Sequence, residues 1–232
     1  MAATRPAAVL TACLEAERAQ REAIRHYALG ETLLEPHVWL LTLVYFGQNV
    51  SGYGLLFFLP TIVKSFGVST LINGVVSALP FVFAAVAMIY WSRRSDKSGA
   101  RTMYVASACL LSAAGLMACV FIGPEHPVLM MVVLILGIMG QYTIAPTFWP
   151  LPTAMLSGVA AAGGIALINA VGNLGGFLGP YMFGLIKDAT GGSDLIALLA
   201  IGAAPVISAV ILVTLGHDTR LERIPHETAA AE

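Results

Sequence analysis

The chain has 232 residues, of which 58% are hydrophobic and only 11% are charged, whereas a soluble domain carries roughly 25% charged residues. Such a composition excludes an ordinary water-soluble domain, because the chain has too few charged groups to cover a wetted surface. The net charge of −1 comes without an extended basic tract, so no nucleic-acid partner is expected. The sequence predicts a protein whose solvent is the lipid bilayer.

The first segment, residues 1–36, mixes acidic and basic side chains at helical spacing. Glu17 and Arg21 stand four residues apart, as do Arg18 and Glu22, and such pairs support a helix. We expect this segment to be exposed, partly helical and cytoplasmic.

Six apolar stretches follow, each long enough for the roughly 20 residues that a helix needs to cross a bilayer. Polar or turn residues separate the stretches. The predicted spans are about 38–63, 71–91, 102–122, 128–149, 159–186 and 194–216. Residues 37–217 are therefore expected to form an all-α bundle of six transmembrane helices, and residues 218–232 a cytoplasmic tail.

The basic residues are distributed unequally between the two sides of this bundle. Only Lys64 and Lys187 fall on one side, while the other side holds ten of the 12 Lys and Arg residues. The positive-inside rule then places both termini and the loop 92–101 in the cytoplasm. No Asp, Glu, Lys, Arg or His lies deep within a predicted span, although such residues usually mark ion pathways.

The first span has one polar face. Amide and phenol groups are unfavourable against lipid unless they are paired, so this face should point toward other helices or a wet cavity. For Tyr45, Asn49 and Tyr53 two alternatives stay open, namely cavity lining and interhelical hydrogen bonding, whereas Gln48 lies off the face. Three- and four-residue steps place on this face Thr42, Tyr45, Asn49, Gly52, Tyr53 and Leu56.

The loop 92–101 contains a run of functional interest. Gly99 allows a tight turn, and Asp96 can pair with basic neighbours such as Lys97 and Arg101 or cap a helix. Two interpretations are open: a gating latch between helix ends, or a loop that only sets the membrane topology.

In the fourth span, Gln141, Tyr142 and Thr143 precede Pro146, whose missing N–H allows a kink. Trp149 stands at the end of this helix. An aromatic anchor at the membrane interface is common for Trp in such a position, and a place in a substrate cavity is the alternative.

In the fifth span, Asn169 and Asn173 lie one helical turn apart, so each could contact a ligand or bond to a neighbouring helix. Close helix packing explains the glycines of the same span. These form the overlapping small-xxx-small pairs Gly172/Gly176 and Gly175/Gly179.

Three segments carry a family resemblance: YFGQNVSGYGLLFFLPTIVKSFG at 45–67, the loop 92–101, and IALINAVGNLGGFLGPYMFGLIKD at 165–188. Together they resemble the C-terminal half of the anion:cation symporter branch of the major facilitator superfamily, which includes tartrate, hexuronate, galactonate and hydroxyphenylacetate permeases. The resemblance covers about residues 36–216. It implies one half of the family fold, built from two three-helix inverted repeats.

The resemblance also implies roles for single residues. Trp149 aligns with an aromatic residue of the family's substrate cavity, and Asn169 aligns with an asparagine that bonds to substrate. Three positions before Trp149, where some relatives have a polar residue, this chain has Pro146, so that contact is not expected here. The run from Asp96 to Arg101 resembles the superfamily's cytoplasmic loop motif.

Members of this family should be about twice as long, with six more helices before residue 1. Their anion-binding and proton-coupling charges lie mainly in that N-terminal half, so the six-helix chain is expected to need it, or to need a homo-oligomeric partner. Residues 1–36 are similar to the end of a family central loop, which makes truncation the expectation.

The functional expectation is the C-terminal half of a secondary transporter in the cytoplasmic (inner) membrane. It would move a small organic acid together with a proton or another coupling cation. The alternative is a non-transporting fragment, or a structural or interaction protein of the membrane. Because no span carries acids, bases or metal-ligand spacing, no enzyme activity, metal or cofactor is expected.

Overall fold

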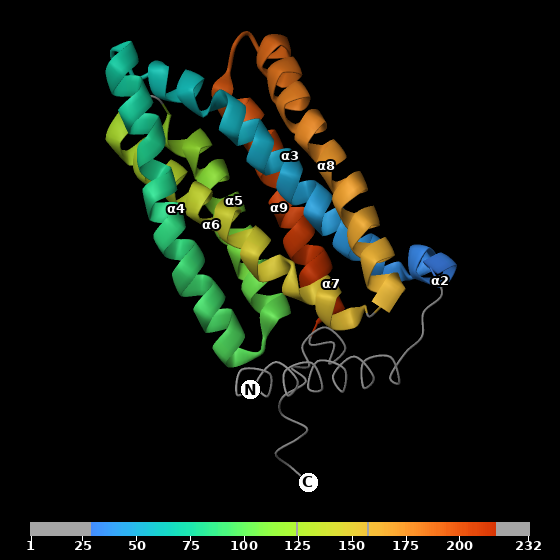
Figure 1. Ribbon diagram of the computed structural model, residues 1–232. Helices are drawn as coiled ribbons and strands as arrows, with labels where there is room; N and C mark the ends of the chain where they lie inside the picture. The colour runs from blue at the N-terminus through green and yellow to red at the C-terminus, as the bar shows by residue number, and fades with distance from the viewer. Residues whose placement is uncertain (1–28, 124, 157, 217–232) are drawn as a thin grey trace, which may run out of the picture.

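The computed structural model is a bundle of long helices (Figure 1) and describes residues 29–123, 125–156 and 158–216. Within these ranges there is no strand. The helices are α2 (Leu29–Leu34), α3 (Pro36–Lys64), α4 (Thr70–Ser98), α5 (Arg101–Ile122), α6 (Pro127–Phe148), α7 (Pro150–Met155), α8 (Gly158–Ala189) and α9 (Asp194–Leu215). Each of the six predicted spans corresponds to one long helix of the structure. Most of the two terminal segments lies outside the described residues.

Local sequence signals set several helix ends. Ser69 caps α4 by accepting a hydrogen bond from the Ile72 N–H at 3.5 Å, and Ser193 caps α9 in the same way. Such caps satisfy N–H groups that have no partner inside the helix. Gly99 ends α4 at a φ of 72° and Gly216 ends α9 at 62°, a conformation that favours glycine.

In the part of the chain that the structure describes, five segments are long and apolar enough to cross a membrane: α4, α5, α6 together with α7, α8 and α9. The remaining long helix, α3, has 29 residues, as many as α4. It is not among these five segments, and its first half carries the polar side chains of Tyr45, Gln48, Asn49 and Tyr53. The long helix outside these five segments is therefore the one with the predicted polar face.

The bundle consists of two similar three-helix units. In the first unit α3, α4 and α5 have 29, 29 and 22 residues, and in the second the segments Pro127–Met155, Gly158–Ala189 and Asp194–Leu215 have 29, 32 and 22. Packing repeats as well: α3 packs against α8 and α9, α6 packs against α4 and α5, and α5 packs against α9. Exchange of the two units leaves this pattern unchanged, as expected for the inverted repeats of one half of a major facilitator fold.

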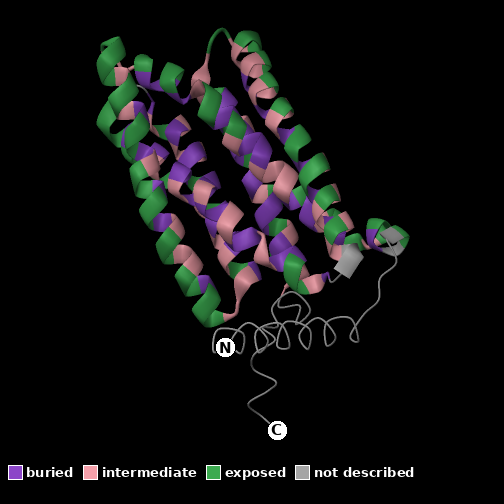
Figure 2. Ribbon diagram, viewed as in Figure 1, coloured by how far each residue is buried: buried purple, intermediate pink, exposed green. Residues whose placement is uncertain are grey.

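The two helices that flank the bundle, α4 and α8, are less buried than the other long helices (Figure 2). Only 28% of the apolar window of α4 and 22% of that of α8 is buried, against 44% to 50% for α5, α6 and α9. Large side chains such as Phe57, Val86 and Phe177 are exposed, which a surrounding bilayer tolerates and water does not. The flanks of the bundle are apolar surfaces that face lipid or another helical unit.

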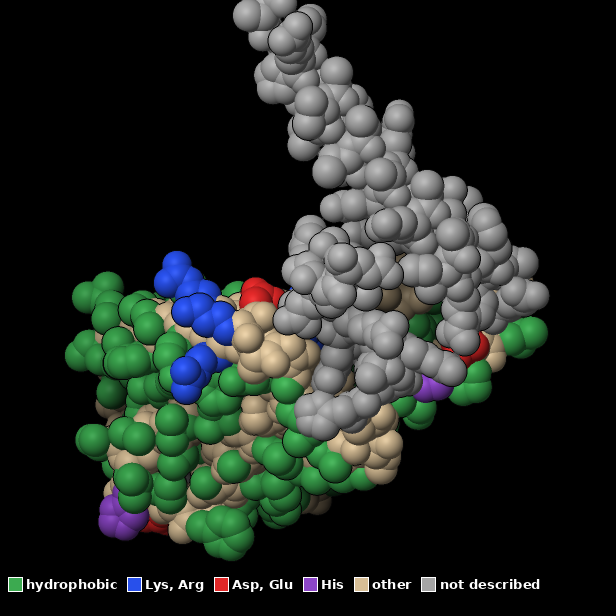
Figure 3. Space-filling model, turned by 90° about the horizontal axis from the view of Figure 1, so that it is seen from below, with side chains coloured by type: hydrophobic (Ala, Val, Ile, Leu, Met, Phe, Trp, Pro, Cys, Tyr) green, Lys and Arg blue, Asp and Glu red, His purple; other side chains and the backbone are tan. Residues whose placement is uncertain are grey.

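The expected loop 92–101 is wrong in extent. The helix α4 continues through Ser92–Ser98, because no helix breaker occurs before Gly99, and α5 already begins at Arg101. Asp96 and Lys97 therefore lie in the last turn of a helix. Basic side chains gather at this end of the bundle (Figure 3), where Arg93, Arg94 and Lys97 are exposed.

Candidate functional site

Direct backbone contact joins α3 and α8. A Cβ atom added at Gly175 would meet the carbonyl oxygen of Phe46, and one added at Gly179 would meet that of Val50. Only glycine permits so close an approach. The close-packing interpretation of Gly175 and Gly179 therefore agrees with the structure.

The other two glycines at the contact between α3 and α8 lie under aromatic rings. The ring of Tyr45 occupies the space where Gly172 would carry a side chain, and the ring of Tyr53 does so at Gly176. The α8 glycines thus fix where the α3 tyrosines lie. Tyr45 is half-buried and Tyr53 is 41% exposed, so the second ring remains accessible from outside the bundle.

Three asparagines form a chain of hydrogen bonds at the contact between α3 and α8. Asn49 is 5% exposed, and its Nδ2 donates to the Gly172 carbonyl at 3.0 Å and to Asn173 Oδ1 at 3.4 Å. The Asn173 Nδ2 donates in turn to Asn169 Oδ1 at 2.6 Å. For Asn49 the structure therefore shows the interhelical hydrogen bonding that the sequence left as one of two alternatives.

The direction of this chain of donors has a chemical consequence. Each amide oxygen of Asn173 and Asn169 accepts from the previous asparagine, so the chain ends on the amide nitrogen of Asn169. Among the described residues no protein acceptor pairs with that nitrogen, and Asn169 is exposed. An amide N–H₂ group is a donor only, so this end of the chain is suited to a carboxylate or hydroxyl oxygen.

An aromatic cluster adjoins the asparagines at the end of α6. The Tyr45 ring is stacked on Phe148 with ring centroids 5.5 Å apart and planes at 16°. It meets Trp149 edge-on at 5.0 Å and 63°. Trp149 follows the last residue of α6, and its N–H bonds to the Ala145 carbonyl at 3.2 Å.

A second aromatic contact borders the same face and was not assigned to the site from sequence. Tyr142 of α6 meets Phe81 of α4 edge-on, with centroids 5.2 Å apart. It stands seven residues before Trp149, so the two rings lie on the same side of α6. Tyr142 lies beside Gln141 in the sequence, which was its only signal, and Phe81 had none. These rings extend the polar face of α3 toward α4.

Gln141 supports the site from behind. It is 2% exposed, and its Nε2 donates to the Gln48 carbonyl at 2.7 Å while its Oε1 accepts from Ser112 Oγ at 3.1 Å. A Cβ at Gly52 would displace this amide. One buried side chain therefore connects α3, α5 and α6.

The structure brings all six predicted substrate-binding residues into one region, which we call the polar seam and define as Tyr45, Asn49, Tyr53, Trp149, Asn169 and Asn173. None of its members is ionisable near neutral pH. The seam can offer hydrogen bonds and stacking surfaces, but it cannot neutralise a carboxylate.

The predicted gating residues form a separate group at the end of α4. The Arg101 Nη2 lies 3.7 Å from Asp96 Oδ1, across the turn made by Gly99. The predicted pairing of Asp96 with a basic neighbour and the turn at Gly99 are thus present. Lys97 is exposed, and nothing in the described residues connects this group to the polar seam.

In residues 29–123, 125–156 and 158–216, the other charged groups lie at or near helix ends. Lys187 and Asp194 form an ion pair of 2.6 Å between the end of α8 and the start of α9. Among the described residues, no group of three or more His, Cys, Asp or Glu side chains could hold a metal ion. The arrangement offers recognition of a polar organic solute by neutral groups.

Comparisons with known proteins agree with this architecture. The model of the Major Facilitator Superfamily matches residues 6–229. Two proteins of Agrobacterium vitis, each described as a putative tartrate transporter, are 40% and 42% identical over 210 and 206 residues. These matches cover 90% and 89% of the chain, and 46% and 47% of the relatives.

A third relative carries a different description. A quinolone resistance transporter of Acinetobacter baumannii is 34% identical over 181 residues, which is 75% of the chain and 40% of that protein. The chain thus spans about half the length of the curated relatives it matches.

Proposed function

The chain belongs to the major facilitator superfamily of membrane transporters, and we propose that it is the substrate-binding C-terminal half of a secondary transporter for a small organic acid. The polar seam is the observation that carries this proposal. It gathers three amides, two phenols and an indole where α3, α8 and the end of α6 meet. Hydroxyl and carboxylate oxygens can bond to the amides, while the rings can cover the carbon skeleton.

The substrate class rests on chemistry and on relatives together. Asn169 presents unpaired donors to the outside of the bundle, which suits an oxygen-rich solute. Relatives at 40% and 42% identity are described as putative tartrate transporters, and tartrate carries two hydroxyls and two carboxylates. An acid of this kind fits the seam better than an apolar solute does.

The charge needed to bind an anion has to come from elsewhere. The seam contains no cation, so the arginine or lysine that neutralises a carboxylate would belong to a second six-helix unit, either an N-terminal half or another copy. The apolar flanks α4 and α8 are suited to packing against such a unit. Transport would then proceed by alternating access, in which the two units rock about a site near the midplane.

Coupling and orientation complete the proposal. We infer symport with a proton or another cation, both termini in the cytoplasm, and residence in the cytoplasmic (inner) membrane. The basic end of α4 supports this orientation through the positive-inside rule. The pair between Asp96 and Arg101 would act as a latch that opens when the two units change their relative tilt.

Uptake tests the proposal directly. The chain would be coexpressed with an N-terminal half from a tartrate-transporter relative, and entry of labelled tartrate into cells would be measured. We expect uptake with both halves and little with either alone. Asn169→Ala should raise the KM about tenfold or more, since a hydrogen bond to a charged group contributes about 1.5–3 kcal/mol. Unchanged KM with intact membrane insertion would remove Asn169 from the site.

The second candidate is a six-helix protein that transports nothing and acts through contacts in the membrane. The large exposed apolar faces of α4 and α8 favour it. Reconstituted chain in liposomes should then take up neither tartrate nor neutral polyols, with or without a partner half. An immunoblot of native membranes, read against the 24.3 kDa of this chain, would show whether it exists in this form.

A further inference from the structure

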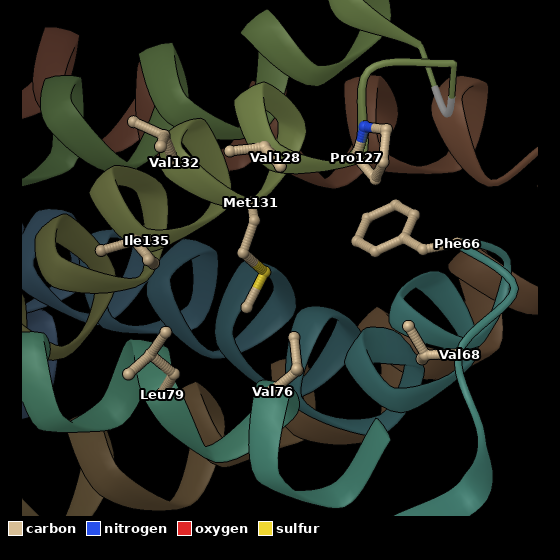
Figure 4. Close-up of a pocket in the computed structure, with 9 residues that line it drawn as sticks. All are labelled: Phe66, Val68, Val76, Leu79, Pro127, Val128, Met131, Val132 and Ile135. Atoms are coloured by element: carbon tan, nitrogen blue, oxygen red, sulfur yellow. The ribbon is translucent and has the colours of Figure 1, made fainter. Parts of the chain in front are cut away.

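An apolar cleft lies between α4 and α6, away from the polar seam (Figure 4). Its volume is about 430 Å³, within the range of about 300–1,000 Å³ found for small-molecule sites. Figure 4 shows Met131 pointing from α6 toward Val76 of α4. The lining residues are all apolar: Phe66, Val68, Val76, Leu79, Pro127, Val128, Met131, Val132 and Ile135.

The cleft opens on the side of α4 that faces away from the polar seam. On the seam side, Phe81 of α4 contacts Tyr142 of α6. Leu79 precedes Phe81 by two residues, which places it about 160° around a helix of 3.6 residues per turn. A second helical unit that covers the seam therefore leaves this opening exposed to lipid.

An apolar cleft at this depth needs an apolar occupant. Water molecules in it would find no hydrogen-bond partner on the lining. An empty cleft would leave its lining atoms without contacts on one side. The abundant apolar molecule around a membrane-spanning helix is a lipid chain, so chain occupancy follows from the surroundings of the protein.

The entrance of the cleft adds polar recognition. A second hollow shares Pro127, Val128 and Val132 with the first and continues to Glu125 and His126. Both of these residues are exposed and directly precede α6, so they lie where lipid headgroups begin. A carboxylate beside an imidazole complements a headgroup that carries an ammonium beside a phosphate.

From this geometry we propose that the cleft binds one acyl chain of an amine-bearing phospholipid, with its ammonium on Glu125 and its phosphate beside His126. The site is independent of the proposed transport, because neither the cleft nor its entrance shares a residue with the polar seam. The proposed site would select one type of phospholipid at one defined position on the surface of the bundle.

Native mass spectrometry of the full 232-residue chain in detergent tests this inference. The delipidated protein would be titrated with phosphatidylethanolamine or phosphatidylcholine that carry identical acyl chains. We expect one phosphatidylethanolamine adduct to form with several-fold preference. Equal binding of both lipids would overturn the proposal, and so would a protein dimer that excludes lipid.

Matched tryptophan variants locate the adduct. Leu79→Trp should fill the cleft and reduce the adduct at least fivefold, whereas Val82→Trp, on the same helix outside the cleft, should leave it unchanged; the two side chains are 44% and 63% exposed. Val132→Trp and Leu136→Trp form the same kind of pair on α6, at 47% and 40% exposure. Adducts that survive both cleft variants would overturn the assignment.

The headgroup contact has its own variant. Glu125→Gln keeps the size of the side chain and removes its charge, so the preference for phosphatidylethanolamine over phosphatidylcholine should fall to about onefold. Retention of the full preference would overturn the assigned position of the ammonium.

Discussion

Two helix contacts occupy equivalent places in the two repeats and have opposite character. In one, α3 meets α8 through glycines so closely that the backbones touch, and polar side chains fill what space remains. In the other, α6 meets α4 through larger side chains, among them Phe81 and Tyr142, and an apolar cleft remains beside the contact. The comparison indicates that one architecture, used twice, can make a close contact with polar side chains once and a looser apolar contact once.

The largest expected effect comes from breaking the close contact. Gly179→Leu would force a side chain into the Val50 carbonyl, and overpacking of this kind destabilises by about 1–3 kcal/mol or more. We expect a clear loss of thermal stability in detergent, measured as the protein that remains monodisperse after heating. Gly184→Ala is the control, because a Cβ there meets only Phe58 at 3.8 Å. Equal stability of the two variants would contradict backbone contact at this seam.

Removal of the buried amide behind the seam should have the next largest effect. Gln141→Leu leaves the Ser112 hydroxyl without its acceptor, and an unsatisfied buried group costs about 1–3 kcal/mol. The expected loss of stability is about 1–2 kcal/mol by reversible unfolding in mixed micelles. The double variant Gln141→Leu with Ser112→Ala should recover part of it, since both partners are then apolar. No recovery would argue against the bond between them.

A smaller effect is expected at the seam itself. Asn49→Leu removes the bonds to Gly172 and Asn173, and interhelical hydrogen bonds in membranes contribute about 0.6 kcal/mol on average. Stability should fall by roughly that amount in the same assay. If transport is reconstituted, the KM should also rise, because Asn173 and Asn169 lose the partner that orients them. A variant with wild-type KM would mean that the asparagine chain does not position the substrate.

The smallest expected change in stability lies at the end of α4. The side chain of Asp96 is 65% exposed and its contact with Arg101 is long, at 3.7 Å, so Asp96→Asn should change stability by less than about 1 kcal/mol. If the pair between Asp96 and Arg101 acts as a latch, Asp96→Asn should instead alter the rate at which the assembled transporter switches between its inward-open and outward-open states. Unaltered rates would favour the alternative interpretation, in which this segment only sets the membrane topology.

The two contacts also differ in how far the sequence could predict them. The glycine pairs of α8 and the three- and four-residue spacing on α3 indicate close packing and a polar face, because each signal lies within one helix. The contact between Phe81 and Tyr142 and the cleft near Met131 depend on which helices become neighbours in space. Periodicity within a helix does not contain that information.

Helix ends show the same limit. Apolar length predicted the span 71–91 well, but α4 continues to Ser98. Hydropathy marks where lipid ends, whereas the helix ends only at Gly99, which adopts a left-handed conformation. The short helix α7 was likewise predicted only as a polar boundary.

The length of α4 has a consequence for the depth of the protein in its bilayer. Its 29 residues extend about 43 Å at 1.5 Å per residue, while the hydrocarbon core is about 30 Å thick. The excess lies largely in the turns that carry Arg93, Arg94 and Lys97, which belong at the level of lipid phosphates. A thicker membrane would draw these cations toward hydrocarbon or reduce the tilt of the helix. The thickness of the host membrane is therefore a physical variable to which this bundle should respond.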